Sequence, residues 1–128
     1  MNSSFPQTTL QALQPDDADY AAILDVARIP AEQVLTLPIS LHVDSLDRYG
    51  AWAFLLAQLR APDGRRLDFS RTPLAEQAAA GGLSDVYAAL LKQEGAQWRI
   101  VAHVVGPGDV AWESWPQDHG APAALFGQ

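Results

Sequence analysis

Four residues are the candidates for general acid–base catalysis in this sequence: Asp44, Asp85, His103 and Asp109. A carboxyl or imidazole group transfers protons efficiently when burial or a nearby charge brings its pKa close to the working pH. An aspartate at a turn, however, usually accepts hydrogen bonds from neighbouring backbone amides, which is a structural role. The sequence therefore supports acid–base chemistry as an alternative only, with Asp109 or His103 transferring the proton.

The short motifs of nucleophilic, metal-dependent and nucleotide-dependent catalysis are missing. The sequence contains no G-x-S-x-G, S-x-x-K, H-E-x-x-H or Walker motif. It contains no cysteine, which excludes disulfides, thiolate zinc sites, iron–sulfur clusters and a cysteine nucleophile. His42 and Asp44 form the only His-x-Asp pair, and no two histidines have the spacing of metal ligands on a helix. We therefore expect no metal site and no cofactor.

A glycine-rich segment, Gly106 to Ala111, formally matches the G-x-G-x-x-A pattern of dinucleotide-binding proteins. That function requires a helix and a second parallel strand after the glycines, with an acidic residue about twenty positions further on. Only 22 residues follow Gly106, and Pro122 lies among them. The segment is therefore interpreted as a tight turn, in which Gly108 permits a positive φ and the Asp109 side chain bonds nearby amides.

Two tryptophans, Trp112 and Trp115, follow this turn three positions apart. On a helical turn, residues at this spacing share one face. They either pack back over the sheet or form the aromatic wall of a pocket or interface, where tryptophan is enriched. If function is local to one stretch, we predict a binding site formed by Asp109, Trp112, Trp115 and His103.

The net charge of the chain argues against two classes of partner, nucleic acids and anionic membranes. Fifteen acidic and eight basic residues give a net charge of −7 at pH 7. This charge disfavours nucleic acid and anionic membrane surfaces, both of which require a basic footprint. No run approaches the ~18 apolar residues of a membrane-spanning helix. The N-terminus has no signal-peptide pattern. We expect a cytoplasmic protein from the chain as it stands, or a periplasmic or exported one if a leader has been removed.

The elements that must position these residues begin with a helix. Residues 1–15 are polar and contain prolines, so we expect a mobile N-terminal arm. A helix begins near Asp16, because acidic residues favour the positive end of a helix. Its apolar residues recur with helical spacing as far as Ala27. Pro30 then predicts an interruption and a second short helix from Ala31 to about Leu35.

From Ile39 the apolar residues alternate, which indicates strands. The alternation slips at Ser45-Leu46, where we predict a bulge or a strand end. Further strands are expected at 51–60, 65–69, 85–92 and 97–105, and a short helix at about 73–80. The strand at 51–60 is apolar on both faces, so we expect it to be central and covered on both sides.

This order of elements predicts the fold class. A helix followed by an antiparallel sheet of four to five strands is an α+β arrangement. The amphipathic helix needs an apolar surface, which the concave side of a curved sheet supplies. We therefore expect one α+β domain at residues 16–128, with a cone of the cystatin-like or NTF2-like type.

The C-terminal block resembles a group of small bacterial proteins of unknown function. In that group a Trp-led strand ends in a Gly-Pro/Ala-Thr-Asp-Val turn, followed by a Trp-x4-Gly-Ala-Pro tail. The matching residues are Trp98-x-Ile100-Val101, Val105 to Ala111, Trp115-Pro116, Gly120-Ala121-Pro122, Leu125-Phe126 and, upstream, Ile23 to Pro30, Ala51 to Phe54 and Pro62 to Arg65. The resemblance covers about residues 20–126 and implies export for many members but no assigned activity. Gly108 stands where threonine is usual, which removes a hydroxyl group.

Taken together, these features predict a non-catalytic binding protein, with a ligand pocket or an acidic protein-interaction surface. Its partner is a small apolar ligand or a protein; a homodimer is left open. One alternative is an acidic inhibitor or immunity-type protein for a basic bacterial partner. The other is an isomerase- or dehydratase-type enzyme of the NTF2-like kind that uses Asp109 or His103.

Overall fold

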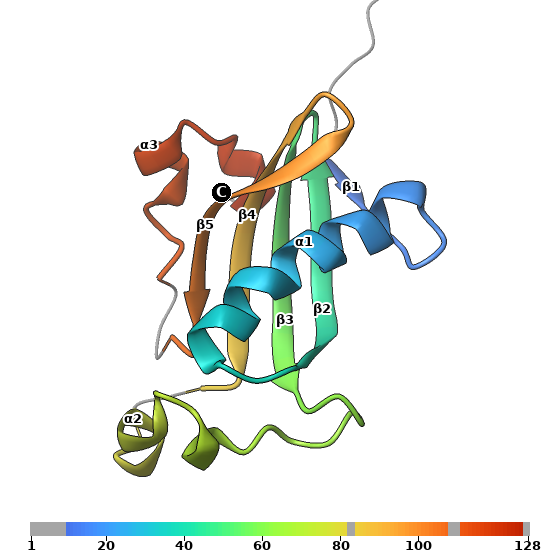
Figure 1. Cartoon of the computed structure of the whole chain (residues 1–128). Helices are drawn as coiled ribbons and strands as arrows, with labels where there is room; N and C mark the ends of the chain where they lie inside the picture. The colour runs from blue at the N-terminus through green and yellow to red at the C-terminus, as the bar shows by residue number, and fades with distance from the viewer. Residues whose placement is uncertain (1–9, 82–83, 108–110, 127–128) are drawn as a thin grey trace, which may run out of the picture.

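The computed structural model describes residues 10–81, 84–107 and 111–126. Five strands form one antiparallel sheet in the order β1-β2-β3-β4-β5, which is not closed, and a long helix packs on one of its faces (Figure 1). This confirms the α+β prediction. The elements are β1 (Leu10–Ala12), α1 (Ala18–Leu35), β2 (Ser40–Tyr49), β3 (Trp52–Arg60), η1 (Phe69–Arg71), α2 (Ala75–Ala79), β4 (Val86–Glu94), β5 (Gln97–Val105), α3 (Trp115–His119) and η2 (Ala123–Phe126).

The helix α1 is held to the sheet by one apolar face. Four residues at a spacing of four, Ile23, Ala27, Ala31 and Leu35, are fully buried, which is the pattern of an amphipathic helix on a core. The helix crosses the sheet diagonally, with its N-terminal end beside β1 and β2 (Figure 1). Apolar residues of β3 and β4 lie beneath it, so this interface is the larger of the two cores.

The prediction of two helices around Pro30 was wrong, because α1 continues through this residue. A proline inside a helix has no N–H to donate, so the carbonyl of Val26 loses its usual partner. The buried face continues on both sides of the proline, and burial outweighs this loss. The Tyr87 hydroxyl from β4 also donates a hydrogen bond of 2.7 Å to the carbonyl of Ala27, next to that of Val26. The sheet therefore supports the helix where proline weakens it.

The first strand, β1, lies in the segment expected to be mobile. Leu10 pairs with Tyr49 and Ala12 with Asp47, and the Leu13 amide donates a 2.8 Å hydrogen bond to the carbonyl of Leu46. Residues 10–12 thus form an edge strand instead of part of an arm, because backbone pairing requires no apolar periodicity. β1 covers only the last three residues of β2.

The strand predicted at 65–69 is not formed. Only an isolated bridge joins Arg66 to Arg60. The Asp68 carboxylate accepts hydrogen bonds from the amide and hydroxyl of Ser70, at 3.0 and 2.6 Å, and this turns the chain into η1. The alternation of Leu67 and Phe69 reflects their packing near the end of the core rather than strand pairing.

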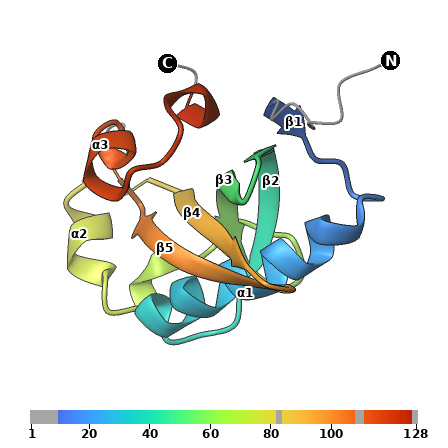
Figure 2. The ribbon, with the colours of Figure 1, turned by 90° about the horizontal axis from the view of Figure 1, so that it is seen from above.

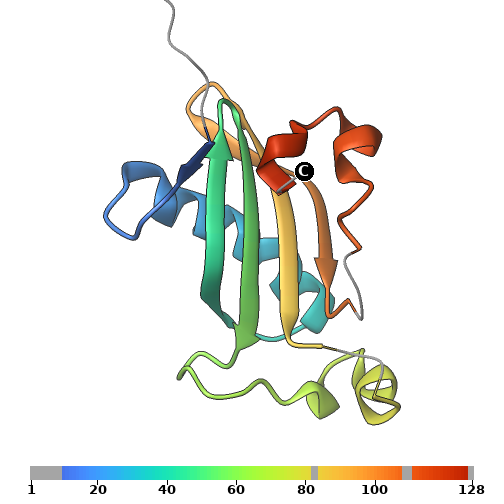
Figure 3. The ribbon, with the colours of Figure 1, turned by 180° about the vertical axis from the view of Figure 1, so that it is seen from behind.

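A second core lies on the face of the sheet opposite α1. The segment from α3 to η2 packs over this face (Figures 2 and 3). The buried residues of this core are Phe54, Ala88, Leu90, Trp115, Ala121 and Leu125. β3 contributes Phe54 to this core and Leu55 to the core under α1. This confirms the prediction that residues 51–60 form a central strand covered on both sides.

One arginine links three parts of the α1 side. Arg48 of β2 forms an ion pair with Asp19 at the start of α1. It also donates hydrogen bonds to the Gln93 side chain at 2.8 Å and to the Gly50 carbonyl at 2.9 Å. Its guanidinium lies 5.1 Å from the centre of the Trp98 ring. The β2–β3 and β4–β5 hairpins and the helix are thus joined through a single side chain.

Candidate functional site

The two tryptophans predicted to form a binding edge both contact Phe54. The ring centroids of Phe54 and Trp112 are 6.0 Å apart, and those of Phe54 and Trp115 are 6.2 Å apart in an edge-to-face arrangement. Trp115 is only 8% exposed, whereas Trp112 is half-buried. They share a face, as their spacing indicated, and that face anchors the C-terminal segment to the sheet.

The structure does not bring His103 together with these tryptophans. His103 pairs with Ala89, which belongs to the core under α1. Because cross-strand partners project to the same face, His103 lies on the α1 side of β5, and Trp115 packs on the other side. The His103 ring lies 6.4 Å from that of Tyr87. Asp109, the remaining predicted site residue, is outside the described residues.

His103 predicts how stability depends on pH. Partial burial lowers the pKa of His103 from its ordinary value of 6.5. The unfolded chain therefore binds a proton at this position at a higher pH than the folded chain does. Folding stability should decrease as the pH falls through about 6.5 towards the folded-state pKa. Urea unfolding at pH 7.5 and 5.5 measures this change. The difference should be smaller in His103→Gln; an equal difference in both proteins would contradict the assignment.

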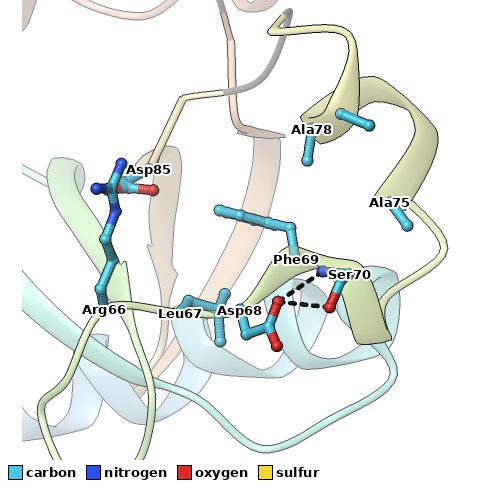
Figure 4. A pocket seen from close by; sticks show the side chains of 9 residues that line it. Arg66, Leu67, Asp68, Phe69, Ser70, Ala75, Ala78 and Asp85 are labelled. Carbon is cyan, nitrogen blue, oxygen red and sulfur yellow. Dashed lines mark hydrogen bonds and ion pairs between the residues drawn. The ribbon is translucent and has the colours of Figure 1, made fainter.

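A pocket of ≈ 380 Å³ lies between the segment containing η1 and the helix α2 (Figure 4). The Phe69 ring points into the space between the Arg66–Asp85 pair and Ala78 (Figure 4). Its polar groups bind one another: Arg66 forms a 3.6 Å ion pair with Asp85, and Asp68 accepts its hydrogen bonds from Ser70. Asp85, an acid–base candidate from the sequence, is therefore the ion-pair partner of an arginine at the rim.

A second hollow region follows the outer edge of β2. It consists of two pockets, of ≈ 360 and ≈ 310 Å³, that share Pro15 and Tyr20. We call the two together the edge groove. The first is lined by Pro15, Tyr20, Ala21, Leu24, Asp25, Arg28, Ser40 and Leu41. The second is lined by Ala12, Leu13, Gln14, Pro15, Tyr20, Val43, Asp44, Ser45, Leu46 and Asp47.

The floor of the edge groove is apolar. Tyr20 and Leu24 of α1 face Leu41 and Val43 of β2, and all four are half-buried at the margin of the core under α1. The turn before α1 lies where the two pockets meet, because Pro15 lines both of them. Here the Gln14 amide donates a 2.7 Å hydrogen bond to the Asp17 carboxylate. Apolar side chains of a bound molecule would therefore meet the margin of an existing core.

Carboxylates flank the sheet edge beside this apolar floor. Asp25 lines the first pocket, and Asp44 and Asp47 line the second. Burial raises the pKa of Asp47, because its ionised form has lost part of its water. The cation in the groove, Arg28, interacts with Asp25 at 3.9 Å and with Glu32 at 3.8 Å. The local charge of the groove is thus negative.

One sequence signal pointed towards this groove. The predicted slip in the alternation of β2 corresponds to a bulge at Asp44, between Val43 and Ser45. A bulge bends a strand and redirects side chains. Here Asp44 lines the groove at the sheet edge, and its carboxylate accepts a 3.4 Å hydrogen bond from the Gln58 side chain. The rest of the groove depends on where β1 stops and where α1 crosses β2, and neither can be read from periodicity.

Comparison with known proteins found no matching family model, curated protein or solved structure. Within residues 10–81, 84–107 and 111–126, no three or more histidine, aspartate or glutamate side chains are grouped so that they could hold a metal ion. In the same part of the chain, no helix has the length and apolar character that crossing a membrane requires.

Proposed function

We propose that the chain is a non-catalytic binding protein that docks a basic protein partner through the edge groove. The observation that carries this proposal is the combination of an apolar floor with carboxylates of α1 and β2 that flank the same sheet edge. A cationic side chain near Asp47 would replace part of the solvation that this carboxylate has lost. The net charge of −7 attracts such a partner over a longer range.

The shape of the groove favours a protein over a small apolar ligand. Small-molecule sites typically enclose about 70–90% of the ligand surface, whereas both pockets here are partly open to solvent along a sheet edge. An inhibitor or immunity-type role against a basic bacterial protein is the narrower form of this proposal. The long helix α1 packed on one face of an open antiparallel sheet supports a cystatin-like or NTF2-like assignment. The acid–base alternative gains no support from His103, which lines none of the three described pockets.

Neutralising the groove tests this function. In a triple variant, Asp25→Asn, Asp44→Asn and Asp47→Asn, partner affinity should fall by roughly tenfold or more, because rim charges steer and orient a basic partner. Immobilised full-length protein is incubated with a native lysate at low salt, and retained proteins are compared with those retained by wild type. Retention should also weaken at 1 M salt, where screening shortens to about 3 Å.

A matched control separates the groove from overall charge. Asp63→Asn, Glu76→Gln and Glu94→Gln change the net charge equally, at exposed positions outside the groove lining. The control variant should retain the same proteins as wild type. Equal loss in both triple variants, or no retained protein at low salt, would contradict the proposed function.

A further inference from the structure

The outer edge of β2 is open along most of its length. β1 pairs only with residues 47–49. Among the described residues, no strand pairs with the outer side of residues 40–45. The chain leaves this edge after Leu13 and turns at Gln14 to Asp17 into α1. The edge groove runs along this open part of the strand.

The register shows which backbone groups face the groove. The Leu59 amide donates to the Asp85 carbonyl at 2.7 Å, on the β4 side. The backbone groups of Leu59 therefore do not bond to those of its partner on β2, Leu41. Ala57 and Val43 lie two residues further along the two strands, so they also form a pair without hydrogen bonds between them. In an antiparallel ladder the backbone groups of such residues point away from the partner strand. Both Leu41 and Val43 thus direct an N–H and a C=O towards the groove.

A strand added at this edge would place alternate side chains on opposite faces of the sheet. Those on the α1 side would enter the pocket formed by Tyr20, Leu24 and Leu41. On the α1 side the strand would approach Asp25. On the opposite face it would approach Asp47, whose cross-strand partner is Phe54 of the second core. The edge of β2 can therefore pair with the backbone of an added strand, hold one of its apolar side chains, and interact with basic side chains on either side of it.

The charges at this edge favour a basic segment over a second copy of this chain. A second copy of this chain would bring another net charge of −7 and the same carboxylates against Asp25, Asp44 and Asp47. Like charges facing one another across a sheet edge are destabilising. A segment carrying lysine or arginine would instead pair with these groups. The open backbone from residue 40 to residue 45 spans roughly 20 Å at about 3.3 Å per residue, which suits a short linear segment.

We propose that β2 binds an extended peptide segment of a partner by strand addition at Leu41 and Val43. The segment has an apolar residue that enters the pocket beneath α1 and basic residues on either side of it. This proposal rests on the proposed binding function and assigns it a mode: main-chain hydrogen bonds supply affinity, and the pocket and carboxylates supply specificity.

The test uses a defined probe. A phage-displayed library of linear nine-residue peptides is selected on the full chain, and the enriched sequence is synthesised. Enriched peptides should contain an apolar residue flanked by lysine or arginine. N-methylation of the peptide amides, one position at a time, should weaken binding about tenfold at alternate positions and have little effect between them, because only alternate amides face β2.

Substitution of the protein gives a second readout. Val43→Pro removes the outward N–H without removing a bond to β3, a position where an edge strand tolerates proline. It should weaken the peptide about tenfold, whereas Val43→Ala, which keeps the N–H, should weaken it much less. Far-UV circular dichroism checks that both variants fold. If Val43→Pro does not fold, the N-methyl scan on the wild-type protein decides the question alone.

The outcomes separate the mode of binding from the proposed function. Peptides that need Asp25, Asp44 and Asp47 but are insensitive to N-methylation and to Val43→Pro would overturn strand addition and leave the binding function standing. Failure to enrich any peptide would overturn strand addition, while the lysate experiment judges the function independently. A homodimer abolished by Val43→Pro, seen by light scattering, would overturn the peptide proposal in favour of self-pairing.

Discussion

Replacing Trp115 with alanine is expected to lower the free energy of unfolding by about 3–5 kcal/mol. The Trp115 side chain is buried on the sheet face opposite α1, and its edge packs against Phe54 at 6.2 Å. Alanine would leave a cavity between the C-terminal segment and β3, beside Leu125 and the Phe126 ring, whose centroid lies 4.5 Å from that of Phe54. Urea unfolding followed by far-UV circular dichroism measures the loss.

The matched variant is Trp112→Ala, at the other tryptophan that contacts Phe54. Because Trp112 is half-buried, its loss should lower the stability by only about 1–2 kcal/mol. Neither variant should change peptide binding at the edge groove, on the far side of the sheet. If Trp115→Ala were as stable as wild type but lost its partner, the C-terminal tryptophans would form a binding edge instead of an anchor.

Replacing Arg48 with methionine is expected to lower the stability by about 2 kcal/mol. Methionine keeps much of the aliphatic length of arginine but loses the hydrogen bond to Gln93, the ion pair with Asp19 and the contact over Trp98. The side chain of Arg48 is 24% exposed, so solvent screens its charge only in part. Thermal and urea unfolding both report the change.

The conservative variant Arg48→Lys separates charge from geometry. Lysine carries the same charge on a single nitrogen and cannot reproduce the planar fork that reaches several partners at once. Arg48→Lys should recover less than half of the stability lost in Arg48→Met. Full recovery would show that charge alone matters, and the description of Arg48 as a geometric link between three elements would then be wrong.

The four long strands and the main helix were predictable because each carries its own local signal. Alternating residues from Ile39, the apolar run of β3, and the Gln93 to Ala96 turn between β4 and β5 all reflect short-range preferences. Two predictions failed, one because a tertiary contact overrides such a preference and one because a competing local hydrogen bond turns the chain. Pro30 stays inside α1 because the buried face continues on both sides of it, and residues 65–69 form a turn stabilised by the Asp68 carboxylate.

The candidate site was less predictable than the fold. Trp112 and Trp115 were selected by residue type, and the structure shows their contacts with Phe54. The edge groove combines Tyr20 with Val43, two residues distant in sequence, and owes its openness to the shortness of β1. A three-residue strand has no periodicity to detect. The sequence therefore did not reveal where β1 ends along β2 or where α1 crosses it, and these two positions create the groove.

The order of the strands in the sheet has a consequence for how the chain folds. Each of β2 to β5 pairs with a strand adjacent in sequence, so most strand pairing closes short loops and requires little chain entropy to be lost at each step. The long connections are residues 13–39, which contain α1 and join β1 to β2, and residues 61–85, which join β3 to β4. Closure of the second is expected to limit the folding rate, because it joins two long central strands. The C-terminal segment has no surface to dock on until β3, β4 and β5 are paired. Its amides are therefore expected to gain protection from hydrogen exchange last.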